Sequence, residues 1–208
     1  MVESKPQTRA EQKERTRRAV LAAALRLSEE TGLGALSLRQ VAREVGIVPT
    51  AFYRHFSSIE ELGLALVDES FESLRAMLRD VRRGNPAPAE IIARSVTVLG
   101  EHVRAQRGHF AFIARERASG PRVVRDAVRH QLELFERELA ADLARLPVGR
   151  WSTEDLQVLA NLIVGAVVST VEDLLATPRH GQQALLDRAQ KQLRMIVVGA
   201  LQWRSDYD

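Results

Sequence analysis

Two short helical patterns on either side of a glycine constrain the fold of this chain more than any other sequence feature. Apolar residues recur with a helical period over 38–45, and Gly46 follows them. Ser37 stands at the N-cap position with Gln40 three residues on, which is a capping-box pattern. Pro49 suits the first turn of a second helix, because the N–H that proline lacks has no partner there. The spacing predicts a helix-turn-helix unit.

The second helix of this unit has two chemically different faces. At about 100° per residue, Phe52 and Phe56 share one face, which we expect to pack against the preceding helices. The other face carries Thr50, Ala51, Arg54 and His55, with Tyr53 at the border. Small residues allow close approach to the floor of a DNA major groove, and the polar ones can bind phosphates or base edges. The alternative is a packing corner with incidental polar residues.

Positive charge is concentrated at the N-terminal end. The net charge is +3: residues 1–60 hold 10 basic and 7 acidic residues, and residues 61–208 hold 20 of each. The basic residues of the N-terminal stretch are Lys5, Arg9, Lys13, Arg15, Arg17 and Arg18. This distribution favours nucleic acid or another anionic surface as a partner, although a solvated basic tail has the same composition.

The remaining sequence predicts helices and no strands. Helical segments are expected at about 8–30, 59–83, 89–106, 109–117, 121–145, 153–176 and 182–203, with glycine- and proline-containing breaks such as 84–88 and 147–149. The sequence therefore predicts an all-α protein. An N-terminal arm and a three-helix head occupy residues 1–58, and a six-helix body occupies residues 59–208.

Catalytic and membrane signals are missing from the sequence. The five histidines have no metal-ligand spacing, and neither a G-x-S-x-G motif nor a phosphate-binding loop occurs. No window approaches 18 uninterrupted apolar residues, and the N-terminal segment lacks the apolar core of a signal peptide. The chain has no cysteine, which fits a reducing compartment. We therefore expect a cytoplasmic protein that is not an enzyme and has no membrane span, metal or cofactor.

Residues 16–66 resemble the DNA-binding head of the TetR family of bacterial regulators. The resemblance rests on LSLRQVAREVGI, on the ending Tyr53, His55 and Phe56 of the recognition helix, and on Leu62 in the fourth helix. The candidate DNA contacts that follow are Arg39, Gln40, Val48, Pro49, Thr50, Ala51, Tyr53, Arg54 and His55.

Two positions depart from the pattern of that family. Val48 stands where many members have a serine or another polar residue. Ile59 replaces a lysine that usually contacts a phosphate, so Arg54 or the basic arm would have to supply that contact.

Further strings in both halves of the chain resemble the FabR and DesT type of repressor. They are GIVPTAFYRHF, ELGLALVDES at 61–70, FIARERASG at 112–120, ELAADL at 138–143 and QLRMIVVGALQW at 192–203. Repressors of that type control genes of unsaturated fatty acid synthesis and respond to long-chain acyl thioesters. The resemblance implies that the effector is a long-chain acyl-CoA or an acyl-carrier-protein thioester.

An acyl thioester needs an apolar tunnel for its chain and cations near its anionic head. The candidates for lining such a pocket are Val98, Phe110, Phe112, Ile113, Phe135 and Val167, with Arg115, Arg117 and Arg125 for the anionic head. Each of these has an ordinary alternative, because apolar residues usually form core and arginines usually lie at the surface. Glu116 stands between two of the arginines and could pair with them or with a neighbouring helix.

Two apolar stripes occur on the last two long helical segments. They comprise Leu156, Leu159, Ala160, Ile163, Val167, Val171 and Leu174 in one segment, and Ala189, Leu193, Ile196, Val197 and Ala200 in the other. Such stripes usually form internal core. Their position also matches the two helices that pair across a twofold axis in TetR-like dimers. The resemblance implies a homodimer on palindromic operator DNA, with the long helix at 59–83 as the lever between body and head.

Two other functions remain open from the sequence. One is a TetR-type repressor of an efflux or catabolic gene that senses another hydrophobic small molecule. The other is a non-specific, basic helical protein that binds any polyanion.

Overall fold

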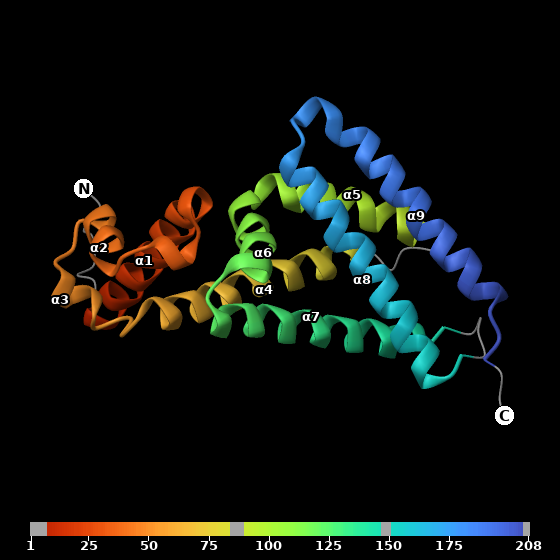
Figure 1. Ribbon diagram of the computed structural model, residues 1–208, viewed down its shortest axis with the longest axis horizontal. Helices are drawn as coiled ribbons and strands as arrows, with labels where there is room; N and C mark the ends of the chain where they lie inside the picture. Colours follow the sequence, from red (N-terminus) through yellow and green to blue (C-terminus); the bar gives the residue numbers. More distant parts are fainter. Residues whose placement is uncertain (1–7, 84–89, 147–150, 206–208) are drawn as a thin grey trace, which may run out of the picture.

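The computed structural model describes residues 8–83, 90–146 and 151–205, which form helices and turns and include no strand (Figure 1). The elements are α1 (Arg9–Thr31), η1 (Leu33–Ala35), α2 (Leu38–Val45), α3 (Pro49–Phe52), α4 (Ile59–Arg82), α5 (Ile91–Ala105), α6 (Arg107–Ser119), α7 (Arg122–Leu143), α8 (Thr153–Ala176), η2 (Arg179–Gly181) and α9 (Gln182–Gln202). The all-α prediction is confirmed. Lys5 of the basic stretch and the predicted breaks at 84–88 and 147–149 lie outside the described residues.

Local sequence sets the ends of the head helices. The Ser37 hydroxyl accepts a hydrogen bond from the Gln40 N–H at 3.1 Å, so the predicted N-cap of α2 is confirmed. Gly46 ends α2 with φ 74°, and Gly32 ends α1 with φ 78°. Residues with a side chain adopt such positive φ values only with strain, which explains glycine at both ends.

One hydrophobic cluster fills the head and continues into the body. Phe52 and Phe56 are buried in it together with Leu62 and Leu66 of α4. The same cluster includes buried residues of α6 and α7, namely Phe112, Ile113, Val124 and Val128. The head is therefore packed against the body directly and is not attached through α4 alone.

A second cluster holds the other end of the body together. It combines the C-terminal half of α4 with α5, α8 and α9. The buried members of the two predicted stripes are Leu159, Ala160, Val171 and Leu174 of α8, and Ala189 and Leu193 of α9. These stripes thus contribute to the core of a single chain. Figure 1 shows α4 leading from the head (α1 to α3) along the body, with α8 and α9 at the far end.

Candidate nucleic-acid interface

The recognition segment consists of a short helix and the turn that follows it. α3 ends at Phe52, but the Tyr53 N–H still reaches the Pro49 carbonyl at 3.1 Å and the Phe56 N–H reaches the Phe52 carbonyl at 3.2 Å. The helical winding therefore extends to Phe56. The two phenylalanine rings lie 6.0 Å apart, centroid to centroid, and both are buried, as the two-faced pattern predicts.

Most of the outer face of this segment is exposed. Val48 is 63% exposed and Tyr53 is 57% exposed, and neither belongs to the buried cluster of the head. The exposed predicted contacts also include Arg39, Pro49, Thr50 and Arg54, whereas Gln40, Ala51 and His55 are half-buried. An exposed apolar valine suits contact with base methyl groups, and an exposed tyrosine hydroxyl suits contact with a phosphate.

His55 lies between the recognition segment and α1. Burial lowers the pKa of the His55 imidazole, and the charges of Lys13, Arg17 and Arg54 lower that pKa further. Nδ1 of His55 is buried and has no hydrogen-bond partner in the described part of the chain. Both effects favour the neutral imidazole, which can still donate or accept a hydrogen bond.

A cationic hollow adjoins the recognition segment. It has a volume of about 380 Å³ and is lined by Ala10, Lys13, Glu14, Arg17, Arg54 and His55. The guanidinium of Arg17 lies 4.5 Å from the centroid of the buried Phe56 ring, a cation–π contact that fixes its position. The sequence placed Arg17 in a basic N-terminal stretch but did not predict where its side chain lies relative to the recognition helix. The fold places it beside the predicted DNA contacts Arg54 and His55, where it can bind a phosphate.

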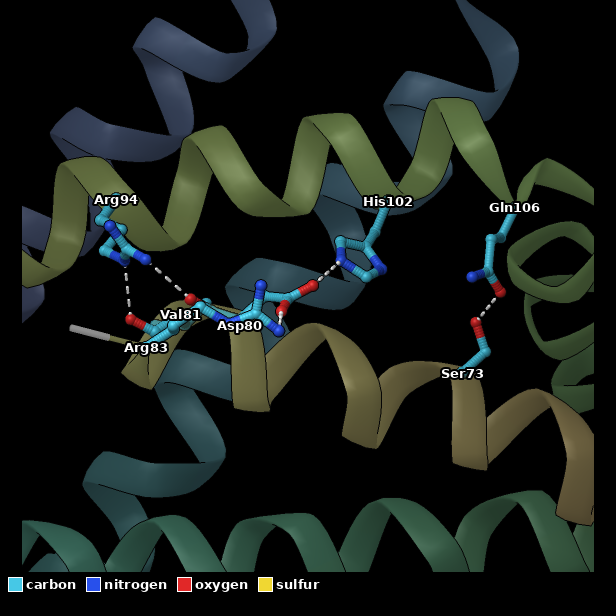
Figure 2. A network of polar contacts seen from close by, with 7 residues as sticks. All are labelled: Ser73, Asp80, Val81, Arg83, Arg94, His102 and Gln106. Atoms are coloured by element: carbon cyan, nitrogen blue, oxygen red, sulfur yellow. Dashed lines mark hydrogen bonds and ion pairs between the residues drawn. The ribbon is translucent and has the colours of Figure 1, made fainter. Parts of the chain in front are cut away.

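Polar contacts join α4 to α5 (Figure 2). Asp80 bonds Nε2 of His102 at 3.0 Å, Ser73 bonds Gln106, and Arg94 donates to the Val81 carbonyl at 2.9 Å. The hydrogen bond from His102 lowers the pKa of the Asp80 carboxyl. Because each contact needs a defined partner, they specify one register of α4 against α5.

The predicted effector residues do not line one cavity. Phe112 and Ile113, with Phe135 partly buried against them, belong to the cluster shared with the head. Val98 and Phe110, with Val167 partly buried, belong to the cluster at the far end of the body.

The three predicted arginines are each bound to a protein acceptor. Arg115 donates to the Ser28 carbonyl at 3.1 Å, and Arg125 donates to the Gly120 carbonyl at 3.3 Å. Arg117 forms an ion pair with Glu172 of α8. An open hollow of about 470 Å³ between α1, α6 and α8 includes Phe112 and Arg115 but no other predicted pocket residue.

The outer faces of α8 and α9 carry apolar side chains that the chain itself does not cover. The exposed residues are Val158, Leu162, Met195, Val198, Leu201 and Trp203. Gly165 and Gly199 open onto free space on these helices. α8 has a mean hydropathy of 1.8 over its most apolar 18 residues, of which 22% are buried, so length and composition alone would also allow it to cross a membrane. The two apolar stripes predicted from the sequence include the buried faces of α8 and α9. The exposed apolar residues are not members of those stripes, and only the fold identifies them.

Comparison with protein families and solved structures places the chain among transcriptional regulators. Residues 20–66 match the family described as bacterial regulatory proteins, tetR family, and residues 88–199 match the tetracyclin repressor-like C-terminal domain. A transcriptional regulator from Rhodococcus sp. Rha1 has a similar structure, with 24% identity and a TM-score of 0.68 over 88% of this chain and 97% of that chain.

Two further solved structures share this fold. A TetR transcriptional regulator from Legionella pneumophila is 17% identical, with a TM-score of 0.65 over 92% of this chain and 98% of that chain. The multidrug binding protein EbrR, solved in complex with imidazole, is 21% identical, with a TM-score of 0.61 over 86% of this chain and 93% of that chain. At these identities the likeness concerns the fold.

Proposed function

The chain belongs to the TetR family of bacterial regulatory proteins, and on that premise we propose that it is a repressor that reads a palindromic operator with residues 48–55 of each head. TetR regulators bind operator DNA, respond to small molecules and dimerise, and they are not enzymes. The observation that carries the proposal is the exposed pair Val48 and Tyr53 beside the hollow that contains Lys13, Arg17 and Arg54. Such a surface combines direct contact to bases with binding of phosphates.

A second copy of the chain is the proposed partner of α8 and α9. Burial of the exposed apolar side chains of these helices against a partner is favourable. Two copies of α8 and α9 related by a twofold axis would form a four-helix bundle. Two heads would then reach two half-sites of a palindrome, about one helical turn or more apart. Regulators of this family are in general soluble cytoplasmic proteins, and we propose the same location here.

A long-chain acyl-CoA or acyl-carrier-protein thioester is the proposed effector, with unsaturated fatty acid or desaturase genes as the target. The support is the set of sequence strings shared with the FabR and DesT type in both head and body. The candidate lining residues lie in two packed clusters, so the ligand would have to part α6 from its neighbours in order to enter. An effector that binds one arrangement of the heads more tightly than the other would change operator affinity.

A hydrophobic drug or metabolite is the alternative effector, and the target would then be an efflux or catabolic gene. The similar fold of the multidrug binding protein EbrR favours this second candidate.

Fluorescence anisotropy on a palindromic promoter fragment from a desaturase or fatty acid synthase gene tests both proposals. Specific binding should exceed binding to random DNA at least about 10³-fold at one salt concentration. Oleoyl-CoA and palmitoyl-CoA should then change operator affinity unequally. Tight specific binding that ignores both thioesters would retain the regulator and reject the lipid effector. Equal affinity for any DNA would reject the operator-reading head in favour of a general polyanion binder.

A further inference from the structure

The C-terminal end of α6 is joined to the head by polar contacts that DNA reading does not use. Oε1 of Glu116 accepts a buried hydrogen bond from the Leu33 N–H at 3.0 Å. The neighbouring Arg115 donates to the Ser28 carbonyl at 3.1 Å, a carbonyl that also receives the Gly32 N–H at 2.9 Å. Two adjacent residues of the body thus hold the end of α1 and the start of η1.

Leu33 is wedged between two further elements of the molecule. Its side chain is fully buried. A Cβ atom on Gly63 of α4 would lie 2.4 Å from Cδ2 of Leu33 and 2.8 Å from Cγ2 of Val124 on α7. α4, α7 and η1 therefore meet with no room to spare, and the carboxylate of Glu116 fixes the backbone of the wedge.

Packing alone does not explain a glutamate at position 116, because a buried carboxyl group with an unsatisfied oxygen destabilises the fold. It is 1% exposed, and its Oε2 has no hydrogen-bond partner among the residues that the structure describes. Burial raises the pKa of the Glu116 carboxyl, although the Leu33 N–H and the Arg115 charge oppose that shift. A half-satisfied buried carboxylate destabilises a fold compared with an apolar side chain of similar size. We therefore attribute a positioning role to Glu116: it fixes the backbone of Leu33.

α6 is tied to the opposite side of the body as well. Arg117 pairs with Glu172 of α8, and Arg107 donates to the Leu175 carbonyl at 2.7 Å. α6 thus connects the helix that carries the uncovered apolar face with the head, along a route that bypasses α4.

We propose that Glu116 and Arg115 form a latch that holds the head at one angle to the body, so that displacement of α6 moves the head. Without the latch the head samples several angles, and fewer molecules have the spacing that an operator requires. Operator affinity falls in proportion to that fraction. This last consequence rests on the proposed operator binding, and a distance between two heads rests on the proposed dimer, which sedimentation velocity checks first; the contacts of the latch rest on neither.

The angle of the head can be measured directly, because the chain has no native cysteine. Arg43 on α2 is exposed, and an R43C substitution carries one nitroxide label per head. Electron–electron double resonance on the full-length protein, without DNA or effector, then gives the distance distribution between the two heads. Operator affinity is measured separately on the unlabelled variants, so failure of the operator proposal does not affect the test of the latch.

Glu116→Ala should broaden the distance distribution and weaken operator binding about threefold to tenfold. Glu116→Gln retains an acceptor for the Leu33 N–H and should restore both to wild type. Ser119→Ala is the matched control, because the Ser119 hydroxyl bonds only the Arg115 carbonyl of its own helix in the described structure.

Two outcomes would overturn the latch: an unchanged distribution in Glu116→Ala, or a Glu116→Gln variant as broad as Glu116→Ala. Should Glu116→Ala fail to fold, Arg115→Ala replaces it. That variant removes the contact to Ser28 and the positive charge beside Glu116, and an unchanged distribution there would equally reject the proposal.

Discussion

Tyr53 is exposed on a head whose two phenylalanines are buried. Its ring meets Phe52 edge to face, with centroids 6.2 Å apart and planes at 85°. This contact restricts the tyrosine ring, so a contact with DNA at this position would cost little side-chain entropy. At the scale of single residues, a buried aromatic therefore sets the direction of an exposed one.

Tyr53→Ala should weaken operator binding about tenfold, because it removes the proposed phosphate contact together with the restricted ring. Anisotropy at fixed salt gives the affinity, and circular dichroism checks that the fold is retained. Val123→Ala on α7 is a matched control, since Val123 is 50% exposed and is not among the predicted DNA contacts. Equal affinity of the Tyr53 variant and the wild type would reject the role of Tyr53.

Glu116→Gln should stabilise the protein at neutral pH, and the gain should shrink as the pH is lowered. The folded-state pKa of Glu116 lies above its ordinary value, chiefly through burial. The wild type therefore loses stability as the pH rises through that pKa, whereas glutamine does not titrate. Urea unfolding at several pH values between about 4 and 8 measures the difference. A constant difference across this range would contradict the prediction.

α4 has a different neighbour along each part of its length. Its first turns pack in the head cluster, Gly63 accommodates Leu33 and Val124, and its second half lies against α5 through the Asp80–His102 and Ser73–Gln106 contacts. At the scale of elements, a shift of α4 along its axis would break contacts at both ends together.

Gly63→Ala should destabilise the protein by about 1–3 kcal/mol, because the added methyl group overpacks the crossing with η1 and α7. Glu69→Ala on the exposed side of the same helix is the control, and it should be nearly neutral. Urea unfolding compares the two. If the Gly63 variant were as stable as the control, the Leu33 side chain could move aside at little energetic cost, and the helices would not be tightly packed at this crossing.

Helix positions could be predicted from the sequence, and side-chain partners could not. Apolar period and a glycine end locate α2, and apolar period locates α8, because those signals are local. The hydrogen bond that the Leu33 N–H donates to Glu116 joins residues 83 positions apart, whereas the sequence left Glu116 open to pairing with the arginines beside it or with a neighbouring helix. The outer face of α8 was missed for a related reason: an all-round apolar helix does not reveal which side the chain itself covers.

At the scale of the whole molecule, a single chain leaves its C-terminal helices incomplete. Leu162→Glu should therefore dissociate the dimer, since it places a charge in the proposed four-helix bundle. Sedimentation velocity at micromolar concentration measures the change. Val123→Glu introduces the same charge at an equally exposed valine on α7 and should leave the dimer intact. A Leu162 variant that sediments as the wild type would move the interface elsewhere.

The cluster that continues from the head into α6 and α7 limits how DNA-reading modules can be exchanged between such regulators. A hybrid joined at the start of α4 would keep Val48 and Tyr53 of its donor yet set Leu33 against a foreign Val124 and a foreign Glu116. Its heads would recognise the donor's sequence but stand at the wrong angle. A transferable module therefore includes the end of α6 and the first turn of α7, two segments more than 50 residues from the recognition helix.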